Sequence, residues 1–205
     1  MHPRAPYSGV VSTSTPEAKK ALRARILSRR AALKAGELAR AAASIRDVAL
    51  AVPEVAGARR VAAYVSVGSE PGTGPLIETL SDTGVEVLLP QLQPDGDLDW
   101  APYEGPQALV TAARGLLEPA GSPLGVNAAD DADALLVPGL AADRSGGRLG
   151  RGGGSYDRVL ARQGGRRFTC VLLHDGEVMD IPVPREPHDV PVTAAATPSG
   201  LHRFR

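Results

Sequence analysis

The sequence predicts one α/β domain with a mostly parallel central sheet and helices on both faces, a three-layer arrangement. Apolar stretches of strand length alternate along the chain with segments of helical pattern, as in strands joined by crossover helices. Hydrophobic residues make up 43% of the 205 residues, which is enough for a sizeable core. Aromatic residues are only 3%, so Val, Leu, Ile and Ala must build that core. No internal repeat divides the chain, and we expect the domain to span residues 14–205.

The N-terminal part predicts a short tail followed by a helical pair. Residues 1–13 mix Pro, Ser, Thr and Gly without periodicity, so we expect a disordered tail. The run STPE at 14–17 is a helix start, with either Thr15 or Ser14 as the cap. The first helix runs to about residue 33, and a second helix spans about 37–52, where a proline ends the pair.

The first helix is strongly basic, and its charge has two interpretations. Leu22 and Ile26 share one face, and the rest is crowded by Lys19, Lys20, Arg23, Arg25, Arg29 and Arg30. Most such runs are solvated faces. Alternatively, Lys19 and Arg23, which are one turn apart, point together at an anionic ligand.

The remaining elements follow from apolar runs and turn signals. Buried strands are predicted at 60–67, 85–89, 134–137 and 167–173, with a short helix at 75–80 and a last apolar stretch at 190–196. Asp95-Gly96 predicts a hairpin leading into 98–103. The loop after the first strand carries Glu70, and open α/β sheets bind ligands in such loops. A loop glutamate is, however, commonly just solvated.

A glycine-rich segment is the strongest functional signal. Six of the nine residues from Gly146 to Gly154 are glycine, and the charges among them are Arg148 and Arg151. Free backbone N–H groups ahead of a helix that begins near Ser155, together with two arginines, suit phosphate oxygens. Asp157 in the first helical turn is suited to an accompanying metal ion. The pattern is neither a Walker loop nor a dinucleotide fingerprint, and a flexible surface loop is the alternative.

Composition excludes several other classes of protein. Basic and acidic residues balance at 23 each, which argues against a dedicated nucleic-acid binder. No apolar run is long enough for a membrane span and no signal peptide is evident, so we expect a cytoplasmic protein. The single Cys170 lies in an apolar run and is predicted to be a core residue. Trp100 and Tyr103 are predicted to pack rather than to stack on a ligand.

The chain resembles the 5-formyltetrahydrofolate cyclo-ligase family, also called 5,10-methenyltetrahydrofolate synthetases, from about residue 19 to residue 197. The resemblance is carried by KKALR at 19–23, Ser66 with Glu70 and Thr73, GLLEP at 115–119, PGLAADRSGGRLGRGGGSYD at 138–157, and His188-Asp189 with Thr197. Three positions depart from the family pattern. Gly153 stands where a lysine is frequent, Ser155 replaces the first of two tyrosines, and Ala142 replaces a common phenylalanine. These departures bear on substrate affinity more than on reaction type.

The resemblance implies an enzyme that uses ATP and Mg²⁺ to cyclise 5-formyltetrahydrofolate to 5,10-methenyltetrahydrofolate through a phosphorylated formyl group. It implies catalytic roles for Arg148, Lys19 and Tyr156, and magnesium ligation by Asp157 and Asp189. The implied ATP-binding residues are Lys19, Lys20, Arg23, Arg148, Leu149, Gly150, Arg151, Gly152, Gly153, Gly154, Ser155 and Tyr156. The implied folate-binding residues are Val65, Glu70, Arg151, Gly152, Gly154, Ser155 and Tyr156.

The expected partner is therefore a small-molecule folate, with or without a polyglutamate tail, bound by a monomer or weak homodimer. Neither nucleic acid nor membrane is an expected partner. Two other classes stay open. One is a related ATP-dependent ligase or kinase for another small molecule, and the other is a non-catalytic folate- or nucleotide-binding protein of the same fold.

Overall fold

The computed structural model describes residues 15–186 and 189–204, apart from the side chain of Arg114. The predicted tail at 1–13 and His188 therefore lie outside the described residues. The first helix, α1 (Thr15–Ala31), begins within the predicted start signal. Pro53 does not simply end the helical pair, as expected, because it occupies the first turn of a further short helix. A proline is tolerated there since the first-turn N–H has no helical partner.

The centre of the molecule is a seven-stranded sheet in the order β12-β11-β9-β6-β1-β2-β3. Neighbours from β11 to β2 run parallel, whereas β12 and β3 pair antiparallel at the two edges. The predicted mostly parallel sheet and the predicted hairpin between β2 and β3 are thus confirmed. The strands are β1 (Arg60–Ala62), β2 (Glu86–Leu92), β3 (Leu98–Pro102), β6 (Ala134–Pro138), β9 (Phe168–Leu172), β11 (Ala194–Thr197) and β12 (Gly200–Arg203).

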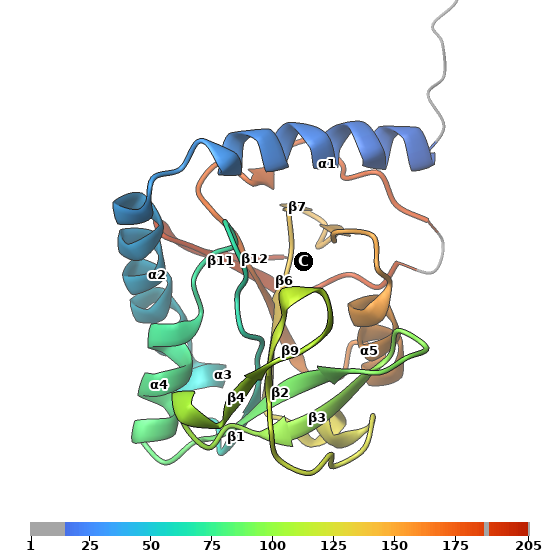
Figure 1. The fold of residues 1–205 in the computed structure, drawn as a ribbon. Coiled ribbons are helices and arrows are strands. Elements are labelled where there is room, and N and C mark those ends of the chain that lie inside the picture. Colours follow the sequence, from blue (N-terminus) through green and yellow to red (C-terminus); the bar gives the residue numbers. More distant parts are fainter. Residues whose placement is uncertain (1–14, 187–188, 205) are drawn as a thin grey trace, which may run out of the picture.

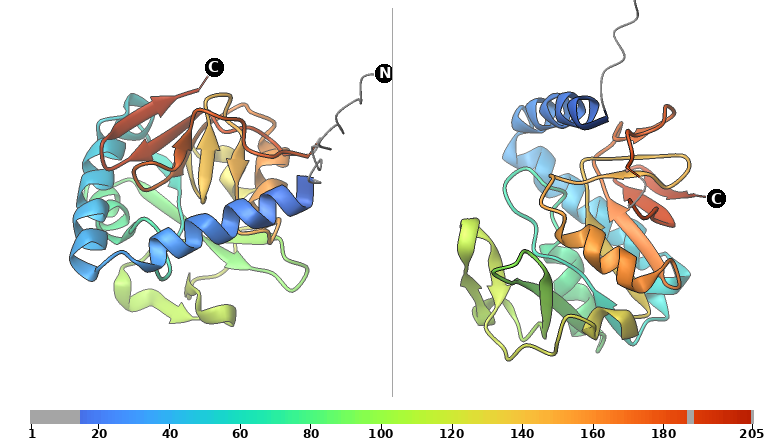
Figure 2. Two further views of the ribbon diagram at one scale, coloured as in Figure 1. Left: turned by 90° about the horizontal axis from the view of Figure 1, so that it is seen from above. Right: turned by 90° about the vertical axis from the view of Figure 1, so that its right-hand side faces the viewer.

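Helices cover both faces of this sheet (Figures 1 and 2). Strand β6 shows why, since Ala134 and Leu136 pack into one buried cluster and Leu135 and Val137 into another. Successive strand side chains point to opposite faces, so an entirely apolar strand needs cover on both. One face is covered by α2 (Ala35–Leu50), α3 (Pro53–Ala56) and α4 (Gly74–Asp82), and the other by α5 (Ser155–Gln163) and a 3₁₀ turn, η3 (Ala128–Asp131).

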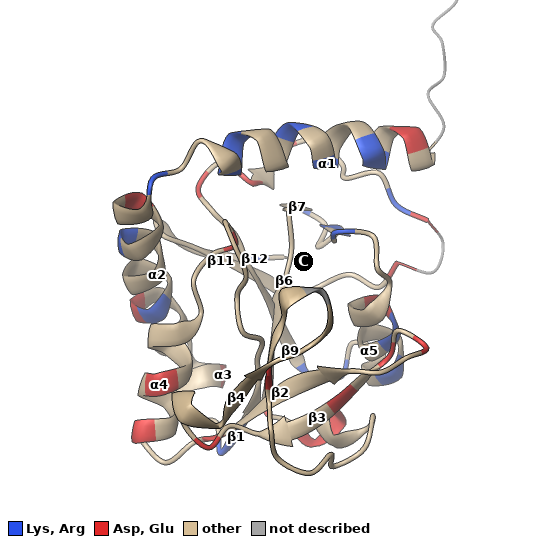
Figure 3. Cartoon of the chain, in the orientation of Figure 1, with Lys and Arg blue, Asp and Glu red and all other residues tan. Residues whose placement is uncertain are grey.

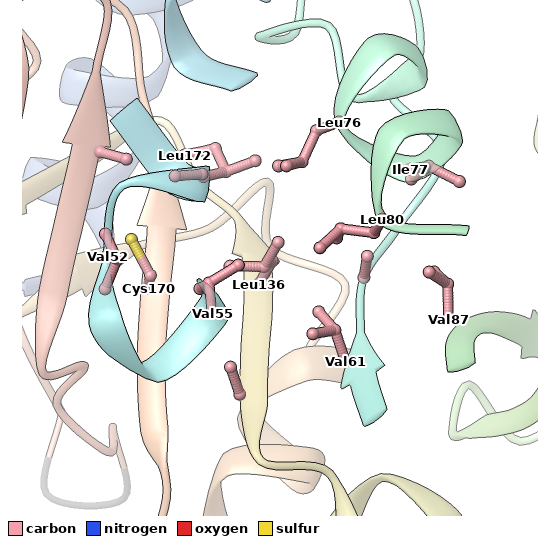
Figure 4. Packing of buried hydrophobic residues seen from close by; sticks show 14 of the residues in the cluster. Val52, Val55, Val61, Leu76, Ile77, Leu80, Val87, Leu136, Cys170 and Leu172 are labelled. Atoms are coloured by element: carbon pink, nitrogen blue, oxygen red, sulfur yellow. The ribbon is translucent and has the colours of Figure 1, made fainter. Parts of the chain in front are cut away.

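The packing confirms the expectations for the core. Figure 4 shows Leu76 and Leu80 of α4 packing near Val61 and Leu136 of the sheet. Cys170 lies in the same cluster, and burial raises the pKa of its thiol to about 12, which keeps it protonated and unreactive. Trp100 is fully buried on the opposite face. The three-layer prediction is confirmed.

Helix α1 lies across the edge of the sheet where the parallel strands end (Figure 1). Beneath it is a small sheet in the order β10-β7-β8, formed by β7 (Ala141–Asp143), β8 (Arg148–Leu149) and β10 (Val178–Met179). Ile26 of α1 packs with Leu149 in a separate small core. A hairpin of β4 (Leu109–Thr111) and β5 (Leu117–Pro119), with short 3₁₀ turns η1 (Pro106–Ala108) and η2 (Ala113–Gly115), flanks the main sheet. Neither small sheet was predicted.

The predicted strand at 60–67 is shorter than expected. It ends at Ala62 because Ser66 and Thr73 join the two ends of the following loop. The Ser66 N–H donates to Thr73 Oγ1 at 2.9 Å, and the Thr73 N–H donates to Ser66 Oγ at 3.1 Å. Thr73 Oγ1 also donates to the carbonyl of Tyr64 at 2.6 Å. These side-chain bonds compete with a strand ladder and fold the loop back at the sheet edge.

Across the described part of the chain, no helix has both the length and the apolar character needed to span a membrane.

Candidate functional site

A cavity of about 330 Å³ opens at the edge where the parallel strands end. Eleven of the predicted site residues line it, namely Val65, Glu70, Arg148, Gly150, Arg151, Gly152, Gly153, Gly154, Ser155, Tyr156 and Asp157. Its remaining wall comes from segments that no prediction assigned to the site, namely Tyr64, Val67, Pro90, Leu92, Leu98, Leu116, Leu117, Glu118, Pro138 and Gly139. The cavity therefore has one side of glycine backbone and charge and another side that is largely apolar.

The glycine loop, residues 146–154, is anchored at its start by Asp143. The carboxylate accepts hydrogen bonds from the N–H groups of Ser145, Gly147 and Val183 and from the Ser145 hydroxyl. Burial opposes the charge of Asp143, but these hydrogen bonds prevail and lower its pKa. Gly146 has a φ of +80°, and a Cβ there would lie 2.3 Å from the Val192 carbonyl oxygen. Glycine is needed at this position by both conformation and space.

The second half of the loop leads directly into α5. Gly152 and Gly154 have φ values of +100° and +76°, and Gly154 is the residue that precedes the helix. Arg23 of α1 donates from Nε to the Gly150 carbonyl at 3.0 Å, and its guanidinium lies against Gly152. Figure 3 shows basic residues on α1 and on the chain below it. An arginine, a helix N-terminus and flexible backbone N–H groups thus meet at one end of the cavity.

Arg148 is the most enclosed cation of the loop. Its Nη1 donates to the Pro138 carbonyl at 2.8 Å, and its Nη2 pairs with Asp157. The side chain is 4% exposed, and its Nε has no hydrogen-bond partner among the described residues. A buried guanidinium with a free N–H is suited to a ligand oxygen.

Glu70 and Arg151 form an ion pair in the cavity lining. Arg151 Nε lies 2.9 Å from Glu70 Oε1, and Glu70 Oε2 accepts from the Val67 N–H at 3.0 Å. Glu70 is 8% exposed, whereas Arg151 is half exposed. The interpretation of Glu70 as a solvated loop residue is therefore wrong, because its carboxylate is held in the cavity wall.

Lys19, also predicted to bind phosphate, contacts the far end of the chain rather than the cavity. Its Nζ lies 2.8 Å from Glu186 Oε2 and 2.7 Å from Asp189 Oδ2. Burial lowers the pKa of Lys19, but the hydrogen bonds to Asp189 and Glu186 outweigh it and raise the pKa overall. The Asp189 carboxylate also accepts from the Glu186 N–H at 2.8 Å. Of the two predicted magnesium ligands, Asp157 lines the cavity and Asp189 does not.

Three other predicted residues also lie outside the cavity lining, namely Arg23, which contacts the glycine loop, Leu149 and Lys20. Leu149 is buried in the small core beneath α1, so its side chain packs rather than binds. Lys20 is exposed. No group of three or more His, Cys, Asp and Glu side chains suited to a metal ion occurs within the described ranges. A magnesium ion at this site would thus depend on oxygens from its ligand as well as on carboxylates.

A buried ion pair lies behind the cavity wall. Arg30 of α1 binds Glu177 through Nε and Nη2 at 2.8 and 2.6 Å, and its Nη2 also donates to the Gly139 carbonyl at 2.8 Å. Glu177 accepts from the His174 N–H, and His174 Nε2 lies 3.1 Å from the Ser69 carbonyl. The pair therefore joins α1 to the ends of β6 and β9 and to the loop that carries Glu70. Arg30 is 1% exposed, so the solvated-face interpretation of the basic helix is wrong for this residue.

The apolar wall was missed by sequence reasoning about the site. Leu116, Leu117 and Glu118 belong to the motif GLLEP, which supported the resemblance but suggested no role. The signal for the others is weaker, because Leu98 was predicted only as a strand residue, and Pro90 and Leu92 lay outside the predicted strand at 85–89. The hairpin that carries them was predicted from Asp95-Gly96, but its local pattern does not indicate that it borders the cavity.

Fold and site together define the class of protein: an α/β protein with a ligand cavity at the carboxyl edge of a parallel sheet and a basic glycine loop in its wall. The sequence profile of the 5-formyltetrahydrofolate cyclo-ligase family matches residues 15–198. The chain belongs to this family, and it is a ligase.

Known relatives agree with this assignment. A 5-formyltetrahydrofolate cyclo-ligase from Mycolicibacterium smegmatis is 45% identical over 145 residues, which cover 68% of this chain and 74% of the relative. One from Escherichia coli is 36% identical over 150 residues, 72% of this chain and 82% of the relative. The solution structure of Aquifex aeolicus 5,10-methenyltetrahydrofolate synthetase aligns with a TM-score of 0.78 at 28% identity, covering 91% of this chain and 93% of the other.

Proposed function

We propose that this ligase converts 5-formyltetrahydrofolate to 5,10-methenyltetrahydrofolate, with ATP as phosphoryl donor, Mg²⁺ as accompanying ion, and ADP and phosphate as further products. The observation that carries the proposal is the cavity itself. One wall offers Arg148 and the glycine loop, the mouth offers Glu70, and the opposite wall is apolar. A folate and the terminal phosphates of a nucleotide need these different surroundings side by side.

The donor set fits the phosphates of ATP. Arg148 Nε is buried without a partner in the described structure, and Arg23 lies against the loop. The open space around Gly153 and Gly154 leaves the backbone accessible, since a Cβ at either would meet no atom closer than 3.9 Å. Backbone N–H groups from Gly150 to Tyr156 and the two arginines would hold the triphosphate, with Lys19 and Lys20 reaching it from α1.

The carboxylates available to magnesium fit a site shared with the nucleotide. Asp157 would hold the ion from the first turn of α5, with phosphate oxygens and water in the other positions. Asp189 is the second proposed ligand. The 2.7 Å contact between its Oδ2 and Lys19 Nζ puts it beside the proposed phosphate-binding lysine.

The folate would occupy the rest of the cavity. Glu70 is an acceptor suited to paired ring N–H donors, and Val65 and Tyr156 would contact the ring. Leucine and proline side chains of the opposite wall would cover its apolar parts and exclude water.

The chemical difficulty of the reaction is that an N-formyl carbon is a poor electrophile. ATP would supply a phosphoryl group to the formyl oxygen with release of ADP, and Mg²⁺ would neutralise phosphate charge. N10 of the folate would then bond to the formyl carbon as the phosphorylated oxygen leaves as phosphate. The protein holds the two substrates in line and stabilises the negative charge through Arg148 and the loop N–H groups. Lys19 adds positive charge, and the Tyr156 hydroxyl, which burial keeps protonated by raising its pKa, donates near the formyl group.

Incubation of the purified protein with 5-formyltetrahydrofolate, ATP and Mg²⁺ tests the proposal through the near-ultraviolet absorption of the methenyl product. We expect product only when all three are present. Binding of both substrates without turnover would instead identify a non-catalytic binding protein. ATP binding without folate binding would indicate a ligase or kinase for another substrate.

The magnesium assignment has its own test. We expect Asp157→Ala to raise the Mg²⁺ concentration that gives half-maximal rate by about tenfold, because one charged ligand is lost. The matched control is Asp175→Ala, which changes an acidic residue outside the cavity lining. An Asp157 variant with an unchanged magnesium titration would remove Asp157 from the ligand set.

A further inference from the structure

Tyr64 lies two residues after the end of β1 and is a residue of the cavity wall that the sequence did not single out. It is 4% exposed, and its ring packs in the core cluster formed by α2, α4 and the sheet. Its backbone is fixed as well, because its carbonyl accepts the Thr73 hydroxyl at 2.6 Å. Tyr64 is therefore a rigidly held residue that lines the cavity and packs its ring in the core.

The hydroxyl of Tyr64 is buried and has no hydrogen-bond partner in the described part of the protein. A buried hydroxyl without a partner has lost its hydrogen bonds to water and gained none in the fold, so it destabilises the folded state relative to a satisfied one. A phenylalanine would fill the same packing space without this cost. The hydroxyl is thus unfavourable for folding of the protein alone, and such a group needs an explanation outside the folded chain.

The surroundings of this hydroxyl indicate what it binds. Two other residues that line the same cavity, Tyr156 and Arg148, also have a buried polar atom without a partner in the described structure, namely Oη and Nε. Glu70 lines the same cavity. Burial first and the charge of Glu70 second raise the pKa of Tyr64. The neutral phenol of Tyr64 can donate a hydrogen bond to a ligand, whereas the carboxylate of Glu70 can accept one.

We propose that Tyr64 is a substrate-binding residue whose hydroxyl donates a hydrogen bond to an acceptor atom of the folate ring, next to the ring donors bound by Glu70. The proposal rests on the proposed function, because it takes the folate as the ligand. The proposal predicts that removal of the Tyr64 hydroxyl weakens binding of the folate without destabilising the folded protein.

The test is Tyr64→Phe, with Tyr103→Phe as the matched control. Tyr103 packs against the same core but does not line the cavity. Calorimetric titration with 5-formyltetrahydrofolate and thermal unfolding without ligand are measured for both variants and for the wild type. We expect Tyr64→Phe to raise the Kd for the folate about tenfold, the loss of one hydrogen bond. Its unfolding temperature and its KM for ATP should be no worse than those of the wild type, and Tyr103→Phe should leave folate affinity unchanged.

Two results would overturn the role of Tyr64 while leaving the proposed function intact. The first is that the wild type converts the folate and Tyr64→Phe binds it with the same affinity as the wild type. The second is weaker affinity together with a lower unfolding temperature, which would make the hydroxyl structural. A wild-type protein that neither binds nor converts the folate would overturn the proposed function, and the role of Tyr64 with it.

Discussion

Two contacts fix the Arg148 side chain, and a third N–H group has no partner in the described structure. The atoms that position the guanidinium are therefore different from the N–H group proposed to bind the ligand. Pro138 and Asp157 position the guanidinium, while Nε has no partner among the described residues and is proposed to bind the ligand. The charge of Arg148 is therefore set in place before any substrate binds. Such preorganisation is worth most when negative charge develops in the transition state.

We expect Arg148→Ala to lower kcat/KM for the proposed reaction by at least about tenfold, because a charge-assisted phosphate contact is removed. Initial rates of methenyl product formation give the measurement. Arg158→Ala is the control, since Arg158 is half exposed on the same helix as Asp157 and does not line the cavity. A near-normal rate for Arg148→Ala would contradict its catalytic assignment.

Asp143 is a second residue with a defined role, because its carboxylate anchors the glycine loop rather than binding the ligand. Because its pKa is lowered in the folded protein, its contribution to stability is present above its ordinary value of 3.8 and is lost as pH falls through the folded-state pKa. We expect Asp143→Asn to lower the free energy of unfolding by about 1–3 kcal/mol near pH 6 and by less below pH 4. Urea unfolding across this pH range is the measurement. Asp180→Asn, in an exposed ion pair with Arg144, should show little change at either pH.

At the scale of elements, α1 is fixed over the sheet by buried charge as well as by apolar contact. The Arg30–Glu177 pair connects it to the segment after β9, and the Gly139 carbonyl adds a third contact. The position of α1 sets the position of Arg23, which touches the glycine loop. Loss of this pair should therefore affect both stability and the site.

We expect Glu177→Gln to lower the free energy of unfolding by roughly 3–5 kcal/mol, because it leaves the Arg30 guanidinium buried without a counter-charge. Denaturant titration measures this effect. Glu54→Gln is the matched control, since Glu54 binds Arg203 with two contacts of 2.7 Å at a partly exposed position, where such pairs contribute at most about 1 kcal/mol. Equal losses in the two variants would show that burial is not what matters.

The sequence predicts elements better where a local pattern decides the outcome. The four apolar strands, the glycine loop and the helix after it are all found, because alternation, turn chemistry and capping act over a few residues. The strand at 60–67 is too long in the prediction, since Ser66 and Thr73 override its apolar pattern through side-chain bonds. The burial of Arg30 is not predictable either, because its partner is 147 residues away in the sequence.

For the whole molecule, the proposed site would be assembled from segments that are far apart in the sequence. Arg23 comes from α1, Arg148 and the glycine loop from the centre, and Lys19 meets Asp189 near the C-terminus. A ligand that contacts all of these parts stabilises the folded state as a whole, because it binds no unfolded chain.

We expect MgATP at one hundred times its Kd to raise the free energy of unfolding by about 2.7 kcal/mol. At the same concentration, Arg23→Ala should show a smaller rise, since it removes a proposed phosphate contact. Arg25→Ala, on the same helix but bordering a different, apolar groove, should match the wild type. Thermal unfolding with and without MgATP provides the comparison, and equal shifts in all three proteins would exclude Arg23 from nucleotide binding.

The contact between Lys19 and Asp189, 170 residues apart, has a consequence for biosynthesis. A ribosome adds Asp189 170 residues after Lys19, so the growing polypeptide cannot complete this pair until that whole intervening stretch has been synthesised. Nascent chains that stop before residue 186 would carry the glycine loop but not the two carboxylates that bind Lys19. They would also lack β11 and β12, so we expect such truncated products to form only part of the central sheet and not to hold nucleotide.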